Sequence, residues 1–294
     1  MSGTSALYEL PAPAKVNLFL HVVGRRADGY HLLQSVFVPI DWADTLHLER
    51  RPDGRLQRHD LSTPLPPDDL CLRAARTLQQ ASGTTWGADI HIDKRVPAGA
   101  GLGGGSSDAA TTLRALNRLW GLNWPRARLA AIGLTLGADV PFFVHGQPAF
   151  VEGVGERITP LALPRLWLAV VKPAASLGTA QIFGSPALER ATPPVILADF
   201  LASTTLSDCA SAGFGRNDLQ AVAVAQCEEV GRAADWLQAR FGNSRMSGSG
   251  SAVFARAGTG DRPLATWGED QLPARWVGRM CRSLAVHPLA HWAD

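Results

Sequence analysis

Lysine, cysteine and long apolar segments are all scarce in this sequence of 294 residues. Only three lysines occur, Lys15, Lys94 and Lys172, so arginine carries almost all of the positive charge. A formal net charge of +2 offers no basic surface of the kind that binds nucleic acid. No apolar segment approaches the roughly 20 residues that span a bilayer, and the N-terminus lacks a basic-then-apolar signal segment. We therefore expect a cytoplasmic protein with neither nucleic acid nor a membrane as its partner.

The four cysteines are scattered along the chain, and none of them lies in a C-x-x-C pair. Cysteine-rich metal sites need ligands at such close spacing, which argues against a structural zinc site. We expect Cys71, Cys209, Cys227 and Cys281 to be reduced thiols. With 46% hydrophobic and 18% charged residues, the chain has the composition of a globular protein. Its length suits one large domain or two ordinary ones.

The most informative segment has five glycines within the seven residues from Gly99 to Gly105. Glycine lets successive backbone N–H groups converge on an anion, because no Cβ holds the ligand away. Ile90 and Ile92 alternate with polar residues and predict a strand before the loop, and apolar periodicity predicts a helix over 106–120. A strand, a glycine loop and a helix N-terminus together predict a phosphate site. Its expected residues are Pro97, Ala98, Gly99, Ala100, Gly101, Leu102, Gly103, Gly104, Gly105, Ser106 and Ser107.

Two familiar phosphate loops do not fit these glycines. Gly99, Gly101 and Gly104 match the dinucleotide pattern G-x-G-x-x-G, but that fold needs a following strand that ends in a carboxylate. The sequence predicts a second helix there. In the P-loop pattern, Gly105 stands where a lysine is required. A plain connection between strand and helix is the remaining alternative, although such connections rarely need so many glycines.

Strand-like and helix-like segments alternate irregularly along the chain, which predicts a mixed α/β (α+β) fold. The expected strands include 16–23, 35–49, 142–151, 166–171 and 252–255, and the expected helices are 68–80, 106–120, 126–136 and 218–240. Prolines cluster from 160 to 194, which indicates a junction between two parts. We therefore expect two domains, over residues 1–160 and 161–294.

Four further motifs accompany the glycine loop. They are Pro11-Ala-Pro-Ala-Lys-Val-Asn-Leu18, Asp28-Gly-Tyr-His31, Leu136-Gly-Ala-Asp-Val-Pro-Phe-Phe143 and Ser247-Gly-Ser-Gly-Ser-Ala-Val-Phe254. As a set they resemble the GHMP kinases, the superfamily of galactokinase, homoserine kinase, mevalonate kinase and phosphomevalonate kinase. The resemblance implies a two-domain GHMP-kinase fold. Its amino-terminal half would bind ATP with Mg²⁺, and its carboxyl-terminal α/β half would help to bind the substrate.

Two of these motifs narrow the resemblance to one branch of the superfamily. The segment from Lys15 to His31 and the Ala-Asp-Val-Pro-Phe-Phe run are similar to the branch that acts on a methylerythritol alcohol carrying a cytidine diphosphate group. This resemblance implies transfer of the γ-phosphoryl group of ATP to the 2-hydroxyl of that alcohol, in isoprenoid precursor biosynthesis. Homoserine or mevalonate kinase activity is the nearest alternative, and an ATP-binding sensor without catalysis is another. We expect a monomer or a weak homodimer.

Asp139 is the expected catalytic base, because an alcohol becomes a good nucleophile only when a positioned group accepts its proton. Taken alone, an aspartate two residues before Pro141 serves equally well as a cap of a turn. Lys15 lies in an otherwise uncharged stretch, and the resemblance implies that it stabilises developing alkoxide charge beside Asp139. Asn17 is expected on the strand face that carries Lys15, either to orient the substrate or to make a buried hydrogen bond.

The resemblance also implies a pocket for the cytosine ring. Tyr30 and Phe183 would stack on its two faces. His31 would contact the polar edge of the base, together with backbone groups at Gly153 and Val154. For Phe183, packing in a core is the alternative, because its matching motif is short. The expected substrate-binding residues are therefore Asn17, Tyr30, His31, Gly153, Val154 and Phe183.

Ser106 and Ser107 begin the expected helix, and each suits either a helix cap or a phosphate or metal ligand. We expect Ser107 to be the Mg²⁺ ligand. The turn from Ser247 to Ser251 either closes over the phosphate region or only joins two strands. One departure from the superfamily pattern is Asp69, which stands in place of an asparagine near the adenine and loses the amide donor. Residues 256–276 match no motif.

Overall fold

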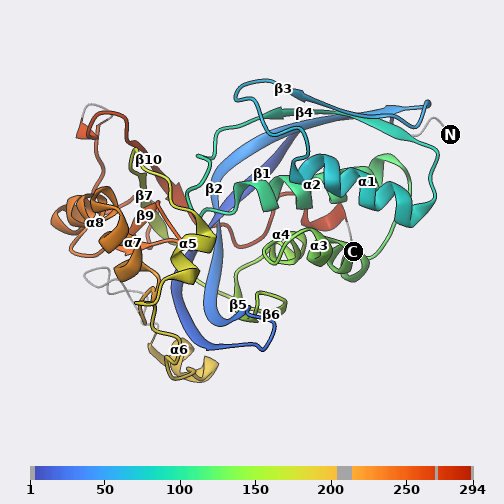
Figure 1. The fold of residues 1–294 in the computed structure, drawn as a ribbon. Helices are drawn as coiled ribbons and strands as arrows, with labels where there is room; N and C mark the ends of the chain where they lie inside the picture. Colours follow the sequence, from blue (N-terminus) through green and yellow to red (C-terminus); the bar gives the residue numbers. More distant parts are fainter. Residues whose placement is uncertain (1–3, 204–213, 269–270, 293–294) are drawn as a thin grey trace.

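The computed structural model describes residues 4–203, 214–268 and 271–292, which form two sheets with helices packed against them (Figure 1). The first part holds strands β1 (Ala6–Arg25), β2 (His31–Arg51), β3 (Leu56–Asp60), β4 (Gly87–Asp93), β5 (Ala149–Gly153) and β6 (Arg157–Pro160), with helices α1 (Leu70–Ser82), α2 (Gly104–Leu119), α3 (Arg126–Leu136) and α4 (Val140–His145). The second part holds strands β7 (Trp167–Lys172), β8 (Arg245–Met246), β9 (Val253–Gly258) and β10 (Val277–Arg282), with helices α5 (Thr179–Gly184), α6 (Leu197–Ser203), α7 (Gln220–Gln226) and α8 (Glu228–Phe241). A short 3₁₀ helix, η2 (Ala290–Trp292), follows.

The longest feature is the antiparallel hairpin of β1 and β2, which curves through the middle of the molecule (Figure 1). One edge of β2 pairs with β1. Its other edge pairs with β4 over 45–51 and with β5 over 33–37. Register shifts just before Lys15 and just after Asn17 interrupt the regular pairing on both sides of this segment. The hairpin therefore presents Lys15 and Asn17 where the two parts of the molecule meet.

Helix α2 is held against the first sheet by the apolar stripe that the sequence predicts. The four members of this stripe are all buried: Ala109, Leu113, Leu116 and Trp120. They share one core cluster with Ile90 and Ile92 of β4. Full burial of a leucine or isoleucine side chain stabilises a fold by about 1.5–3 kcal/mol. Because packing fixes both β4 and α2, the glycine loop between them starts and ends at fixed points.

Alternate residues of β7 face two different cores, as the pleat of a strand requires. Leu168 and Val170 pack with Val16 of the hairpin, whereas Ala169 and Val171 pack with residues of α7 and α8. The second sheet, in the order β10-β7-β9-β8, is therefore buried on both faces. A shared core joins it to the hairpin, so the two parts of the molecule pack directly against each other.

Two expectations about secondary structure are wrong in part. The expected strand over 142–151 begins instead as helix α4, and only β5 from Ala149 is extended. Pro141 stands in the first turn of α4, where its missing N–H leaves no bond unmade, and Gly146 ends the helix in the left-handed region. The expected helix over 218–240 is two helices, because Cys227 is extended, with φ −151° and ψ 101°.

The end of the described chain returns to the first part of the molecule. Leu289 and Trp292 pack on the core of the first sheet, far from β10 that precedes them (Figure 1). A division at residue 160 stays a prediction. Cys71, Cys227 and Cys281 are free thiols, and Cys209 lies outside the described residues. Within the described ranges, no helix combines the length and the apolar character needed to cross a membrane.

Candidate active site

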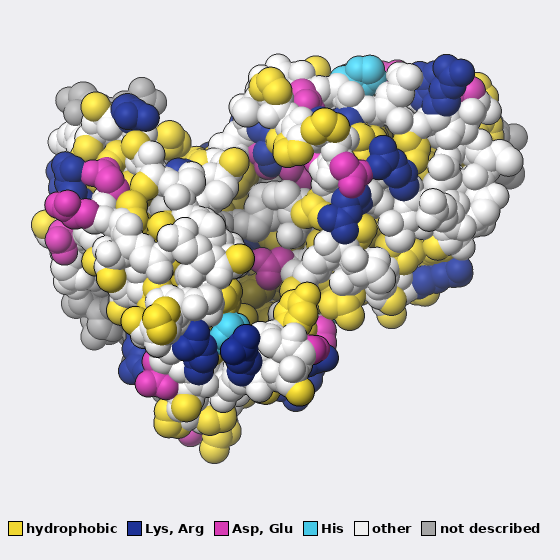
Figure 2. Space-filling view, viewed as in Figure 1, with side chains coloured by type: hydrophobic (Ala, Val, Ile, Leu, Met, Phe, Trp, Pro, Cys, Tyr) yellow, Lys and Arg dark blue, Asp and Glu magenta, His cyan; other side chains and the backbone are white. Residues whose placement is uncertain are grey.

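A cleft of about 760 Å³ opens between the hairpin, the glycine loop, α4 and α5. Figure 2 shows this hollow between the two parts, with acidic side chains inside it and a histidine flanked by basic side chains at its lower rim. The predicted site residues that line it are Lys15, Asn17, Tyr30, His31, Gly101, Gly103, Asp139, Val154 and Phe183. Residues from separate motifs of the sequence thus meet in one cavity.

The glycine loop adopts a backbone that only glycine fits well. Gly101 and Gly103 both have φ of 71°, in the left-handed region. A Cβ on Gly101 would lie 2.2 Å from the carbonyl oxygen of Ser247, and one on Gly103 would lie 2.9 Å from the Phe143 ring. Gly103 is also the N-cap of α2 and makes no side-chain capping bond. The first N–H groups of α2 therefore have no intrahelical partner and are available to an anion.

The turn from Ser247 to Ser251 joins β8 to β9 and also packs on the glycine loop, so it is more than a connection between two strands. The Ser247 hydroxyl donates to the carbonyl of Gly101 at 3.1 Å and accepts the N–H of Asn17 at 3.3 Å. The N–H of Lys15 donates to the carbonyl of Leu102 at 2.9 Å. The loop is therefore clamped between β1 and this turn.

Lys15 and Asp139 face each other in the cleft, with 3.8 Å between Nζ and Oδ2. Lys15 is only 3% exposed and is therefore not a surface lysine. Burial lowers the pKa of Lys15, and the Asp139 carboxylate partly opposes this effect. Asp139 stands at the N-cap position of α4, yet its side chain makes no capping bond. The carboxylate, 32% exposed, thus faces Lys15 and the cleft and does not cap the turn.

Asn17 lies on the same face of β1 as Lys15, which confirms the expectation from strand periodicity. Lys15 Nζ donates to Asn17 Oδ1 at 2.5 Å, and Asn17 Nδ2 donates to the Ser35 hydroxyl at 2.9 Å. Lys15 Nζ also lies 4.6 Å from the centre of the Phe37 ring. Sequence reasoning missed Ser35 and Phe37. Ser35 and Phe37 lie four and six residues after His31 on β2. The two-residue period of a strand therefore places them on the same face as His31, and this spacing could have identified them.

The two serines at the start of α2 differ in exposure. Ser107 is fully buried, and its hydroxyl donates to the carbonyl of Pro13 at 2.6 Å. This geometry directs Ser107 toward β1, which argues against its predicted role as a Mg²⁺ ligand. Ser106 is half-buried and stands at the exposed side of the helix N-terminus. Neither serine caps α2, since the N-cap residue is Gly103.

The predicted base pocket forms the other end of the cleft. The rings of His31 and Phe183 lie 5.0 Å apart, centre to centre, at an interplanar angle of 34°. Tyr30 is 65% exposed at the rim, although it lines the same cavity. The N–H of Val154 donates to Glu156 at 2.6 Å, so this backbone donor is already used within the protein. Gly153 is buried beside it and does not line the cleft. Phe183 lines the cleft and also packs against the second core, so the alternative of core packing is confirmed and stacking on the base stays a prediction.

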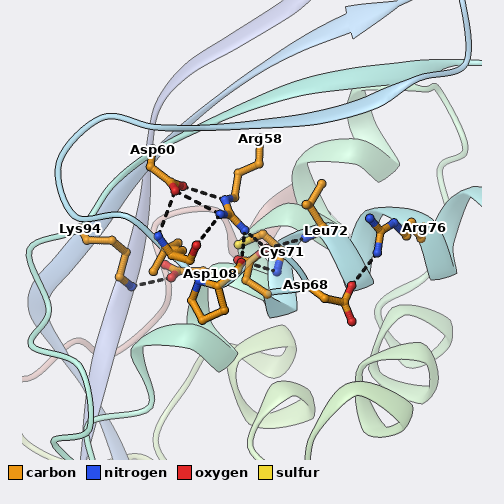
Figure 3. Close-up of polar contacts among 11 residues, drawn as sticks. Arg58, Asp60, Asp68, Cys71, Leu72, Arg76, Lys94 and Asp108 are labelled. Atoms are coloured by element: carbon orange, nitrogen blue, oxygen red, sulfur yellow. Dashed lines mark hydrogen bonds and ion pairs between the residues drawn. The ribbon is translucent and has the colours of Figure 1, made fainter.

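A second lysine, Lys94, lies half-buried beside the glycine loop, between two carboxylates (Figure 3). Lys94 donates to Asp108 at 2.5 Å and also to Asp44. Asp44 accepts two backbone N–H groups as well, from Arg95 and Val96. Burial lowers the pKa of Lys94, but the two carboxylates outweigh burial and raise the pKa above its ordinary value. This lysine is therefore held as a cation by the fold itself.

The departure at Asp69 has a structural explanation nearby. Asp69 caps α1 and accepts the N–H groups of Cys71 at 3.2 Å and of Leu72 at 3.1 Å. Its carboxylate also pairs with the Arg58 guanidinium at 2.7 Å, and Arg58 binds Asp60 in turn (Figure 3). An asparagine would keep the cap but lose the ion pair. In this chain the Asp69 carboxylate is thus bonded to the N-terminus of α1 and to Arg58.

Comparisons with known proteins agree with this site. Residues 69–147 match the GHMP kinases N terminal domain, and residues 205–265 match the GHMP kinases C terminal domain. The 4-diphosphocytidyl-2-C-methyl-D-erythritol kinase of Methylibium petroleiphilum is 64% identical over 289 residues, 98% of each chain. The chain belongs to the 4-diphosphocytidyl-2-C-methyl-D-erythritol kinase family. A kinase of the same name from Variovorax paradoxus is 54% identical over 98% of this chain and 99% of its own.

Solved structures extend the comparison to the fold. A crystal structure of 4-(cytidine 5′-diphospho)-2C-methyl-D-erythritol kinase gives a TM-score of 0.72 at 38% identity, over 85% of this chain and 90% of that one. Homoserine kinase from Cytophaga hutchinsonii gives a TM-score of 0.62 at 16% identity, over 88% of this chain and 87% of its own, a likeness of fold alone. Membership of the 4-diphosphocytidyl-2-C-methyl-D-erythritol kinase family confirms the resemblance predicted from the motifs and the mixed α/β GHMP-kinase fold.

Proposed function

We propose that this chain is a small-molecule kinase that phosphorylates the 2-hydroxyl of 4-diphosphocytidyl-2-C-methyl-D-erythritol, forming the 2-phosphate and ADP. The observation that carries the proposal is the Lys15–Asp139 pair, which lies between the glycine loop and the aromatic pocket in one cleft. The names of its relatives support the same substrate. This reaction belongs to the methylerythritol phosphate route to isoprenoid precursors.

Asp139 and Lys15 divide the chemistry between a proton acceptor and a cation. The partly exposed carboxylate of Asp139 accepts the proton of the substrate hydroxyl as the hydroxyl oxygen attacks phosphorus. The Lys15 ammonium has three N–H donors, of which one is bound to Asn17 Oδ1. The other donors remain for Asp139 and for charge that develops on the attacking and transferring oxygens. Asn17, fixed by Ser35, keeps the ammonium in place.

The glycine loop serves to bind the phosphates of ATP, because its backbone leaves the first N–H groups of α2 open to an anion. Mg²⁺ supplies charge neutralisation on these phosphates when it is bound. Among the described residues, no group of three or more His, Cys, Asp or Glu side chains is placed to hold a metal. This pattern fits Mg²⁺, which takes only one or two protein ligands beside phosphates and water. The half-exposed hydroxyl of Ser106 fits such a role better than buried Ser107.

The test is ADP release by the purified protein with Mg·ATP and one of four alcohols. We expect turnover with 4-diphosphocytidyl-2-C-methyl-D-erythritol and none with homoserine, mevalonate or galactose. Turnover with one of the other three would keep the Lys15–Asp139 chemistry and reject the cytidine pocket. ATP binding without turnover of any alcohol would favour a sensor in place of an enzyme.

We further propose that the enzyme works in the cytoplasm as a monomer or a weak homodimer, without nucleic acid or a membrane as partner. The near-neutral formal charge of +2 supports this assignment. We also propose that its domains are residues 1–160 and 161–294, since the first sheet ends at Pro160 and the second begins at Trp167. Sedimentation equilibrium tests the first statement, and limited proteolysis between 160 and 167 tests the second.

A further inference from the structure

Arg190 links two walls of the base pocket, although it belongs to no motif and does not contact the Lys15–Asp139 pair. Its Nε donates to Nε2 of His31 at 3.2 Å, across 159 positions of the chain. Its Nη2 donates to the carbonyl oxygens of Phe183 at 3.2 Å and Ser185 at 2.6 Å, and its Nη1 to that of Leu188 at 3.0 Å. One guanidinium therefore joins His31 on β2 to the end of α5, which carries Phe183.

The hydrogen bond from Arg190 determines which ring nitrogen of His31 can carry a hydrogen. An arginine side chain has donors only, so its partner atom must accept. Nε2 of His31 is therefore unprotonated, and a neutral imidazole must then carry its hydrogen on Nδ1. A doubly protonated ring would set an N–H against the guanidinium and lose this bond. The contact thus selects one of three protonation forms.

We infer that Arg190 is a positioning residue that fixes His31 as the neutral Nδ1–H tautomer, so that His31 offers a donor to an acceptor on the edge of the substrate base. The inference rests on the proposed function for the identity of that base. Cytosine has acceptors at N3 and O2, whereas uracil carries a hydrogen on N3. A fixed donor at His31 that faces N3 therefore favours cytosine, because the same donor facing N3–H of uracil is left unpaired, whereas O2 is an acceptor in both bases.

The charges around His31 also favour the neutral imidazole. Burial, Arg190 and Arg25 all lower the pKa of His31. Asp28 lines the same cleft, but its side chain accepts the N–H of Tyr30 and pairs with Arg26. The neutral ring is therefore the form present near neutral pH. Its tilted contact with Phe183, at 34° between the planes, holds the ring plane beside the stacking surface.

The first test needs no substitution in the pocket. Long-range ¹H–¹⁵N correlation spectra of ¹⁵N-histidine-labelled protein distinguish protonated from unprotonated ring nitrogens, and His31→Asn assigns the signal. In the wild-type protein, with His31→Asn used only to assign the signal, we expect Nε2 of His31 to be unprotonated and Nδ1 protonated at pH 7.5 without ligand. A hydrogen on Nε2, or a charged ring at this pH, overturns the inference. This measurement decides the matter even if the protein proves to have another substrate.

The second test compares two arginines near the same histidine. Arg190→Met removes the donor to His31 and keeps the length of the aliphatic stem. Arg25→Met removes a neighbouring charge, but the Arg25 side chain donates to the carbonyl of Gly29, and Arg25 pairs with His31 only through the strand backbones. We expect both variants to raise the pKa of His31, and only Arg190→Met to mix the two neutral tautomers. Equal tautomer populations in both variants would contradict the assignment.

Kinetic measurements distinguish positioning of His31 by Arg190 from a purely structural role of Arg190 at the end of α5. With Arg190→Met we expect KM for the cytidine substrate to rise roughly tenfold with kcat within about twofold, as the loss of one positioned hydrogen bond implies. The ratio of kcat/KM for the cytidine substrate over its uridine analogue should also fall roughly tenfold. A variant that keeps the wild-type ratio while KM rises shows support of α5 only and overturns the inference. Absence of turnover by the wild-type protein contradicts the proposed function alone.

Discussion

Lys15 is buried and Lys94 is half-buried, each beside aspartates, yet the two clusters are built differently. Lys94 is enclosed by Asp108, at 2.5 Å, and by Asp44, and both carboxylates are buried. Lys15 stands 3.8 Å from a single carboxylate, Asp139, which is 32% exposed to the cleft. The Lys94 cluster is closed by the protein itself, although Asp108 Oδ1 has no hydrogen-bond partner among the described residues. The Lys15 cluster is open toward a ligand.

The difference shows in the pKa values of the two ammonium groups. Burial lowers the pKa of Lys15 because one distant carboxylate does not compensate, whereas two close carboxylates raise the pKa of Lys94. A group whose charge is only partly balanced can respond to a substrate that brings more charge. The comparison teaches that the same residue pair becomes a structural clamp or a reactive site according to how completely the fold satisfies it.

The largest expected effect comes from the same substitution made in each cluster. Asp139→Asn removes the proton acceptor, so we expect kcat to fall by about 10²–10⁴-fold while the Kd of ATP changes little. Asp108→Asn leaves Lys94 paired with Asp44, and its kcat should stay within about tenfold of the wild type. ADP release and calorimetric titration with ATP measure both quantities. Similar losses of kcat in the two variants would remove the distinction between the clusters.

The reverse contrast is expected for stability when each lysine becomes methionine. Lys94→Met leaves two buried carboxylates without a cation, which should lower the free energy of unfolding by about 3–5 kcal/mol. Lys15→Met leaves only a partly exposed carboxylate and one amide oxygen, and it also removes a cation whose burial is unfavourable, so we expect a change of about 1 kcal/mol or less. Urea unfolding followed by circular dichroism gives both numbers. The comparison breaks if Lys15→Met is as destabilising as Lys94→Met.

A glycine lies next to each cluster, so a Gly→Ala substitution can test how tightly the protein packs around each one. A Cβ on Gly103 would meet the Phe143 ring at 2.9 Å and Lys15 Cγ at 3.3 Å, with φ at +71°. A Cβ on Gly104 would meet Val96 Cγ1 at 3.1 Å and Asp44 Oδ2 at 3.5 Å, within a helix. We expect Gly103→Ala to lower the free energy of unfolding by about 2–3 kcal/mol and Gly104→Ala by about 1 kcal/mol or less. Equal losses would show that the left-handed backbone and the Lys15 side of the loop are not the constrained features.

The smallest and most direct test follows the lysine titrations themselves, because the chain has only three lysines. ¹³C-labelled lysine should give Lys15 titrating below the ordinary value of 10.5 and Lys94 above it. The stabilising contribution of Lys94 is then complete below pH 10.5 and is lost as pH rises through its folded pKa. Lys15 has the opposite sign, so its burial becomes less unfavourable as pH rises from its folded pKa toward 10.5. A reversed order of the two values would refute the electrostatic comparison.

Local patterns predicted much of the fold and the site. Glycine spacing located the phosphate loop, and the apolar stripe of α2 proved to be buried. The two-residue period of β1 placed Asn17 beside Lys15. The same reasoning failed over 142–151, because a short apolar run is compatible with a buried helix or a strand. It also named Ser107 as the Mg²⁺ ligand, whereas the structure buries Ser107 and leaves Ser106 half-buried, since exposure depends on what packs over the helix end.

By itself the sequence determined the loop conformation, the strand face shared by Lys15 and Asn17, and the family to which the chain belongs. Only the tertiary structure decided that Asp139 faces Lys15 without capping α4, that Lys94 is enclosed by two carboxylates, and that Arg190 reaches His31. The physical reason is the distance along the sequence over which each kind of interaction acts. Backbone preferences and side-chain periodicity act over a few residues, whereas charge pairing and burial depend on contacts between segments as much as 230 positions apart.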